Sequence, residues 1–250
     1  MHRIKDLLIA AAWPVASFVV AIATWQIVVR AFHFDKVILP SLLDVAFAIK
    51  RNFHRLVFET GITMAESTLG FLVGSGGAFL LAVIFIHSRP VQRSIYPYAI
   101  ALKSTPLIAI APLLVLWFGN GMLSKVVMAA MVAFFPVLVS SVTGLTSVDE
   151  AMLDLMKSLS ANWLQVLLKV RIPNSLPQLF ASLKIASSMA VVGAVIGEFT
   201  GSTSGIGHLL TTSSYYLETP EVFAGVIFIT VAGLLFFGLV AYIEKKVVSW

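Results

Sequence analysis

The sequence contains no cysteine, and only 12% of its 250 residues are charged. Without cysteine the chain can form no disulfide bond and can offer no thiol as a nucleophile or metal ligand. Its five histidines show none of the paired spacings that are typical of a metal site. Soluble domains carry about 25% charged residues, so this low share, with 59% hydrophobic residues, indicates a protein that crosses the membrane several times.

Motifs that bind nucleotides or perform catalysis are also missing. The pattern G-x-x-x-x-G-K-[ST], which cradles the phosphates of ATP, does not occur, and neither do G-x-S-x-G or H-E-x-x-H. Gly70 and Gly74 lie in an apolar run, where their spacing favours close helix packing instead. We therefore expect that the chain is not an enzyme, and that it binds neither a cofactor nor a metal. The net charge of +5 is spread over the ends of apolar runs, which argues against nucleic acid as a partner.

Six apolar runs are long enough to cross the roughly 30 Å hydrocarbon core of a bilayer. The first, Leu7–Val29, is longer than the apolar core of a secretory signal, which has about 7 to 15 residues, so we expect it to remain in the mature protein. The sequence thus predicts an all-α membrane protein with six transmembrane helices, surrounded by membrane lipid, in one domain that covers residues 1–250. The other five runs are Ile62–Ile86, Val91–Phe118, Leu123–Leu145, Leu176–Phe199 and Val222–Ile243.

The distribution of basic residues predicts the orientation. An even number of spans puts both termini on one side, and an excess of Lys and Arg marks the cytoplasmic side. The opposite side holds five basic residues, which Asp35, Asp44 and Glu59 dilute. We therefore predict that both termini are cytoplasmic. The basic residues on the side of the termini are Arg3, Lys5, Arg89, Arg93, Lys157, Lys169, Arg171, Lys245 and Lys246.

Residues 40–57 predict an amphipathic helix at the outer membrane interface. Ser41 is placed to cap the helix, Asp44 stands three residues later, and apolar residues recur at helical spacing from Leu42 to Val57. Such a helix either connects two spans and packs on the bundle, or offers a docking surface to an external binding protein.

A polar stretch of some 30 residues, Ser147–Pro177, interrupts the apolar runs. Its start, Ser147-Val148-Asp149-Glu150, has the form of a capping box and predicts a helix to about Leu159. Ser160 is placed to cap a second short helix through Lys169, which Pro173 and Pro177 would end. The two helices would present an apolar ridge either to a cytoplasmic partner or to lipid headgroups. The ridge consists of Met152, Leu155, Met156, Leu159 and Trp163.

This stretch resembles the cytoplasmic signature of bacterial ATP-binding-cassette importer permeases, which reads Glu-Ala-Ala, three residues, Gly, nine residues, Ile-x-Leu-Pro. Asp154-Leu155-Met156 stands at the Glu-Ala-Ala positions, Ser160 at the Gly, and Val170-Arg171-Ile172-Pro173 at the last four. In the family the signature forms the coupling helix that the ATPase grips. The resemblance therefore implies coupling roles for Asp154, Leu155, Met156, Ser160, Arg171 and Pro173. Ser160 fits the turn only if its backbone avoids positive φ.

Other segments are similar to the permeases for nitrate, sulfonates, taurine and thiamine pyrimidine precursors. They are Leu39-Pro40-Ser41, residues 106–121, Phe134-Phe135-Pro136-Val137 and Gly205-Ile206-Gly207. The resemblance implies one half of a type I importer in the bacterial inner membrane, working as a homodimer. Its partners would be two cytoplasmic ATPase subunits, which bind ATP and Mg²⁺, and an external solute-binding protein. Closure of the ATPases would turn the dimer from inward-facing to outward-facing, and the substrate would enter at the dimer interface.

The third run holds the leading candidates for the substrate path. Lys103 lies near the membrane midplane, where a charge costs about 2.5–3.5 kcal/mol on insertion scales and therefore suggests a function. We predict a substrate path or gate at Lys103, Ser104 and Thr105; the alternative is that Lys103 pairs internally or extends to the cytoplasmic interface. Three prolines favour bends or breaks in this run: Pro97, Pro106 and Pro112.

Two residues of the fifth run complete the predicted path. Ser187 lies in a stretch rich in small residues, which either packs closely or lines a pore. Glu198, at the outer end, is expected to be a cap or gate, while Glu66 in the second run is too far along the axis to reach Lys103. A stand-alone carrier or channel remains the alternative, although inverted repeats and midplane carboxylates are not evident. A membrane enzyme is a third option.

Overall fold

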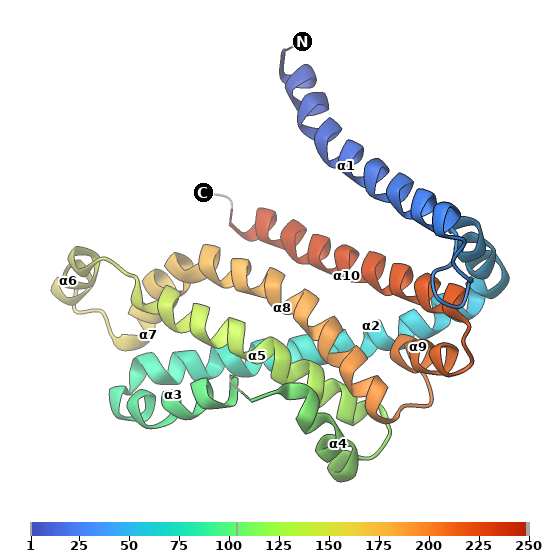
Figure 1. Ribbon diagram of the computed structural model, residues 1–250. Helices are drawn as coiled ribbons and strands as arrows, with labels where there is room; N and C mark the ends of the chain where they lie inside the picture. Colours follow the sequence, from blue (N-terminus) through green and yellow to red (C-terminus); the bar gives the residue numbers. More distant parts are fainter. Residues whose placement is uncertain (1, 104, 249–250) are drawn as a thin grey trace.

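The computed structural model describes the backbone of residues 2–103 and 105–248, and every regular element in these ranges is helical (Figure 1). The side chains of residues 2–12, 14, 99–100 and 102–103 are outside the description. The elements are α1 (His2–Phe32), α2 (Leu42–His87), α3 (Arg89–Lys103), α4 (Leu107–Phe118), α5 (Met122–Thr146), α6 (Glu150–Ser158), α7 (Trp163–Val166), the π-helix η1 (Leu167–Arg171), α8 (Ile172–Gly201), α9 (Ile206–Tyr215) and α10 (Thr219–Val247).

Within the described residues, five helical stretches are long and apolar enough to cross a membrane. They are α1, α2, α5, the unit from α7 through α8, and α10, which confirms the all-α, multi-pass class. The prediction of six continuous spans is wrong at the third, Val91–Phe118. That run is divided between α3 and α4, and α4 has only 12 residues. Pro106 precedes α4 with an extended backbone, because proline cannot donate the hydrogen bond that would continue the helix.

The centre of the bundle is formed by α2, α5 and α8 (Figure 1). Small residues let these helices approach closely. A methyl group at Gly70 would lie 2.8 Å from the Val126 carbonyl oxygen, and one at Gly193 would lie 2.8 Å from Cα of Ala129. These contacts confirm the packing role that the spacing of Gly70 and Gly74 predicts. Ala129 itself is fully buried between the three helices.

Helix α1 stands apart from the bundle and approaches it only near the chain's turn into α2 (Figure 1). At that end the Trp25 indole donates to the Pro40 carbonyl at 3.1 Å, and the Gln26 side chain accepts from the Leu42 N–H at 3.2 Å. Toward the N-terminus its apolar side chains, such as Phe18 and Val20, are exposed. Its apolar surface is therefore available to lipid or to another chain.

The start of α2 agrees with the predicted cap. The Ser41 hydroxyl accepts from the Asp44 N–H at 3.3 Å, and the Asp44 carboxylate accepts from the Ser41 N–H at 3.0 Å, which completes a capping box. The amphipathic helix does not extend to Val57 as expected. A kink with non-helical dihedrals at Asn52 separates residues 42–51 from the long span that follows.

The prolines of the polar stretch do not end a helix, contrary to the prediction. The chain continues from α7 through η1 into α8. Pro173 lies directly after the π-helix, as the second residue of α8, and Pro177 lies inside α8. The wider turn of the π-helix changes the hydrogen-bond register just before Pro173, so the chain stays helical although the proline has no N–H.

Candidate functional site

Helix α6 projects from one end of the bundle (Figure 1). Its cap is Asp149, whose side chain accepts from the Ala151 N–H at 3.1 Å. The predicted cap Ser147 is wrong, since its hydroxyl donates to the Gly144 carbonyl and accepts from the Asn174 amide. Asp149 has the same capping chemistry as serine and stands one residue before the first helical position.

No residue of α6 is buried. Leu155 is 52% exposed and Met152 46% exposed, while Met156 is half-buried. Asp154 is exposed and pairs with Lys157 at 2.8 Å, one turn along the same helix. The apolar ridge predicted from the sequence therefore exists as an uncovered surface.

The turn after α6 corrects the prediction for Ser160. Its φ is +53°, so a non-glycine residue holds the left-handed conformation that glycine usually occupies. The Ser160 N–H donates to the Lys157 carbonyl at 2.9 Å, and the Ala161 N–H donates to the Met156 carbonyl at 3.0 Å. This pair of bonds is a Schellman motif, which closes the helix end.

The second short helix also starts differently from the prediction. Asn162, not Ser160, caps α7 in a reciprocal pair with Gln165, at 2.8 and 2.9 Å. The Trp163 ring then meets the ring of His87, at the end of α2, with 4.5 Å between centroids. The edge-on geometry suits an aromatic contact and joins α7 to the span α2.

Arg171 connects the segment of α7 and η1 to the bundle. Its guanidinium Nη1 donates to the Leu145 carbonyl in the last turn of α5, at 2.7 Å. The last carbonyls of a helix have no intrahelical donor, and a cation there also complements the helix dipole. Pro173 follows at the start of α8 and lines a cavity of about 310 Å³ together with Asp149 and Met152 of the α6 end. Arg171 therefore positions α7 and η1 relative to α5.

The predicted substrate path is only partly described. Lys103 is the last residue of α3, but its side chain and the whole of Ser104 lie outside the described residues. Thr105 is exposed in the break between α3 and α4, where its hydroxyl donates to the Ala101 carbonyl at 3.4 Å. Ser187 is fully buried and donates to the Lys184 carbonyl at 2.8 Å. The structure does not bring Ser187 into the break.

Glu198 lies in a buried polar cluster between α2, α8 and α9. Its carboxylate accepts from the Thr63 hydroxyl at 2.6 Å and from the Gly207 N–H. The Thr63 hydroxyl in turn accepts from the Ile206 N–H at 2.8 Å. Gly205, at φ +95°, has no room for a side chain, because a methyl group there would overlap the Glu198 carboxylate. Glu198 thus accepts a hydrogen bond from a backbone N–H in the first turn of α9, which agrees with a cap role.

Sequence reasoning missed the cation of this region, Lys125. It is fully buried at the start of α5, and its ammonium donates to the Asn120 carbonyl and, at 3.0 Å, to the Gly201 carbonyl. Glu66 is also buried, and its Oε2 has no partner among the described residues. A lysine inside the apolar run Leu123–Leu145 was the available signal, since an intramembrane charge needs a partner.

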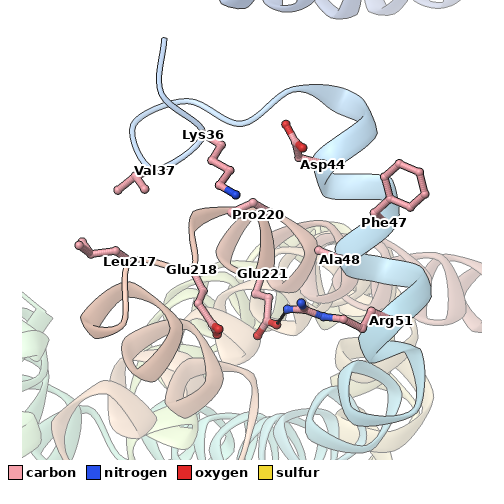
Figure 2. Close-up of a pocket in the computed structure, with 10 residues that line it drawn as sticks. All are labelled: Lys36, Val37, Asp44, Phe47, Ala48, Arg51, Leu217, Glu218, Pro220 and Glu221. Atoms are coloured by element: carbon pink, nitrogen blue, oxygen red, sulfur yellow. Dashed lines mark hydrogen bonds and ion pairs between the residues drawn. The ribbon is translucent and has the colours of Figure 1, made fainter.

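A cavity of about 300 Å³ opens at the other end of the molecule from α6, between the start of α2 and the turn from α9 to α10 (Figure 2). Figure 2 shows Arg51 pointing to Glu221, and the two pair at 2.7 Å. Asn52, the kink residue of α2, also donates to Glu221, at 2.5 Å. These bonds fix α10 to the kink, while Lys36 and Glu218 line the opposite sides of the cavity.

Residues 69–249 match the protein-family model described as "binding-protein-dependent transport system inner membrane component". The chain is 35% identical over 221 residues to a probable ABC transporter permease of Haemophilus influenzae, with 88% of this chain and 90% of that protein covered. A putative aliphatic sulfonates transport permease of Bacillus subtilis is 29% identical, with coverages of 92% and 84%. The formylaminopyrimidine transport permease of Halalkalibacterium halodurans is 28% identical, with coverages of 95% and 95%.

The fold has a counterpart among solved structures. A chain of the inward-facing MetNI methionine ABC transporter superposes with a TM-score of 0.68 at 17% identity, covering 78% of this chain and 97% of that one. At this identity the likeness concerns the fold alone. Because the family model matches most of the sequence, the chain belongs to the family of binding-protein-dependent transport system inner membrane components, the permease subunits of ABC importers.

Proposed function

We propose that two copies of this chain form the membrane pore of an ATP-driven importer, with α6 of each copy docked on a cytoplasmic ATPase subunit. The observation that carries the proposal is the uncovered apolar ridge of α6, with Leu155 and Met152 exposed on a helix that projects from the bundle. Apolar side chains on an extramembrane helix are costly in water unless a partner covers them.

The contacts behind α6 support a coupling role. Arg171 bonds to the end of α5, and Trp163 packs on His87 at the end of α2. Helices α5 and α2 belong to the centre of the bundle together with α8. A displacement of α6 by the ATPase would therefore be transmitted to the spans through short, directional contacts, which is what a switch between inward-facing and outward-facing states requires.

The same end of the molecule is proposed to be cytoplasmic. The C-terminal end of α10, with Lys245 and Lys246 in its last turn, lies at the end from which α6 projects (Figure 1). Basic residues at span ends favour the cytoplasmic side. The cavity of Figure 2 would then face outward, where the solute-binding protein docks.

The solute is proposed to be small and to arrive from that binding protein. Relatives are named for aliphatic sulfonates, which are anions, and for formylaminopyrimidine, which has an uncharged aromatic ring. ATP and Mg²⁺ would be bound by the partner subunit, because the chain has no phosphate-binding loop.

Purification from the native membrane tests the proposal. The chain is expected to bring down an ATPase and to show ATP hydrolysis only in that complex. Reconstituted in vesicles with the binding protein, the complex should accumulate solute only when ATP is supplied. ATP hydrolysis by the isolated chain, or accumulation driven by an ion gradient without ATP, would contradict it and favour the stand-alone carrier.

A further inference from the structure

A groove of about 470 Å³ lies between α2, α3 and α5. Tyr98 of α3 and Phe134 and Met131 of α5 form its walls, and Gly77 of α2 faces it. All the described residues that line it are uncharged, and the Tyr98 hydroxyl is the one polar side-chain group among them. Cavities of about 300–1,000 Å³ with mostly apolar and aromatic walls are typical of small-molecule sites.

Gly77 keeps the groove open. A methyl group at this position would meet only the Phe134 ring, at 4.0 Å. By contrast, a methyl group at Gly74, one turn earlier, would lie 2.9 Å from Cα of Ala130, so Gly74 is needed for helix packing. Helix contact does not require a glycine at 77. Its missing side chain leaves space beside an aromatic ring that a solute can occupy.

The α3 wall belongs to the broken span. Helix α3 ends at Lys103 and α4 begins at Leu107, with Thr105 and Pro106 outside any helix. Irregular backbone is not tolerated against hydrocarbon, because its polar groups have no partner there. The break at Thr105 and Pro106 must therefore face protein or a water-filled space, and the groove residue Tyr98 lies on the helix that leads into it. In the dimer of the proposed function, on which this step rests, that space is the solute path.

We propose that this groove is a subsite of the transport path that selects a flat, uncharged aromatic ring. The ring would occupy the space beside Gly77 and contact the aromatic side chains of Phe134 and Tyr98. A small anion such as a sulfonate would lose hydration there and gain no opposite charge from the lining residues. The groove therefore favours solutes by their ring and not by their charge.

Thiol protection tests the subsite directly, because the natural chain has no cysteine. Met131→Cys places a single thiol in the groove of the full complex in lipid vesicles. A charged, water-soluble methanethiosulfonate reagent should label it. Formylaminopyrimidine, which has an uncharged ring, should slow labelling at least tenfold, and taurine at equal concentration should not.

Two glycine variants in the Met131→Cys background provide the matched comparison. Gly77→Leu places its side chain in the groove, whereas the neighbouring Gly76 does not line the groove and a methyl group there meets no atom within 4 Å. Protection should disappear with Gly77→Leu and remain with Gly76→Leu, while both variants still co-purify the ATPase.

Several outcomes would overturn the subsite while leaving the importer intact. They are a thiol that the charged reagent never reaches, labelling that formylaminopyrimidine does not slow, slowing by taurine to the same extent, and protection that survives Gly77→Leu. Loss of the ATPase from the complex with the natural chain would instead contradict the proposed function. The two failures are therefore distinguishable.

Discussion

Ser160 holds a left-handed backbone conformation at the end of α6, with φ at +53°. For a residue with a Cβ this conformation costs about 1–2 kcal/mol relative to a right-handed one. The Schellman bonds of Ser160 and Ala161 hold it in place. The serine thus stores a small strain at the turn that joins α6 to α7.

Glycine at this position should relieve the strain. We expect Ser160→Gly to stabilise the folded state by about 0.5–1 kcal/mol, the usual difference between glycine and other residues at left-handed helix ends. Hydrogen exchange of the α6 and α7 amides would measure it, with slower exchange expected in the variant. Ser160→Ala is the control, since it retains the strained φ. Equal exchange in the two variants would show that the turn is not strained.

Lys103 remains a prediction for the solute path. It ends α3 beside the break and follows Tyr98 by five residues, about 7.5 Å along a helix axis. Lys103→Met keeps the length of the side chain and removes the ammonium donors that would bind a solute's hydrogen-bond acceptors, so uptake should fall at least tenfold while the ATPase still assembles. Uptake is measured in vesicles with a supplied ATPase and binding protein. Unchanged uptake would leave Lys103 as a packing or interfacial residue.

At the level of elements, the helical segment from α7 through η1 to α8 joins α6 to the spans. The Arg171 side chain, at the end of η1, donates a hydrogen bond to the Leu145 carbonyl of α5, which is 26 residues away in the sequence. Hydrogen bonds that involve a charged group contribute about 1.5–3 kcal/mol. This bond therefore helps to hold η1 against the end of α5.

Removing the guanidinium should uncouple hydrolysis from transport. We expect Arg171→Met to bind the ATPase with nearly normal affinity but to transport severalfold less solute per ATP hydrolysed. Lys169→Met is the matched control, because Lys169 is exposed and its loss removes the same charge. The ratio of uptake to hydrolysis in vesicles is the measurement. Equal ratios in both variants would contradict the positioning role of Arg171.

The local patterns of the sequence predict some elements correctly and miss others. The Ser41 cap and the Gly70–Gly74 packing depend on residues within one or two turns, so spacing alone reveals them. The partners of Lys125 include Gly201, 76 residues away, and no local pattern carries that contact. The π-helix before Pro173 was missed for a different reason. Proline normally ends a helix, and a change of hydrogen-bond register avoids that only in the folded bundle.

At the scale of the whole molecule, two sites lie at opposite ends of the bundle (Figure 1). One end carries the exposed ridge of α6, and the other carries the cavity between α2 and α10. Long spans, α5 and α8 among them, run between the two ends. Packed helices therefore connect the two sites. This arrangement suits a subunit that accepts solute at one end and is moved by an ATPase at the other.

Docking of the ATPase on α6 is tested most directly by the affinity of the chain for its ATPase when the ridge of α6 carries a charge. Leu155→Asp would bury a carboxylate in the contact, which should cost about 2–4 kcal/mol and weaken binding roughly 30- to 1,000-fold. Lys157→Asp places the same carboxylate on the other side of α6 and breaks only an exposed ion pair, which is worth little.

The measurement is the dissociation constant of the purified ATPase for the chain reconstituted in lipid discs. We expect weak binding by Leu155→Asp, near-normal binding by Lys157→Asp, and a folded bundle in both. Normal binding and normal ATP-driven uptake by Leu155→Asp would contradict the central claim, because the ridge of α6 would then not be the surface on which the ATPase docks.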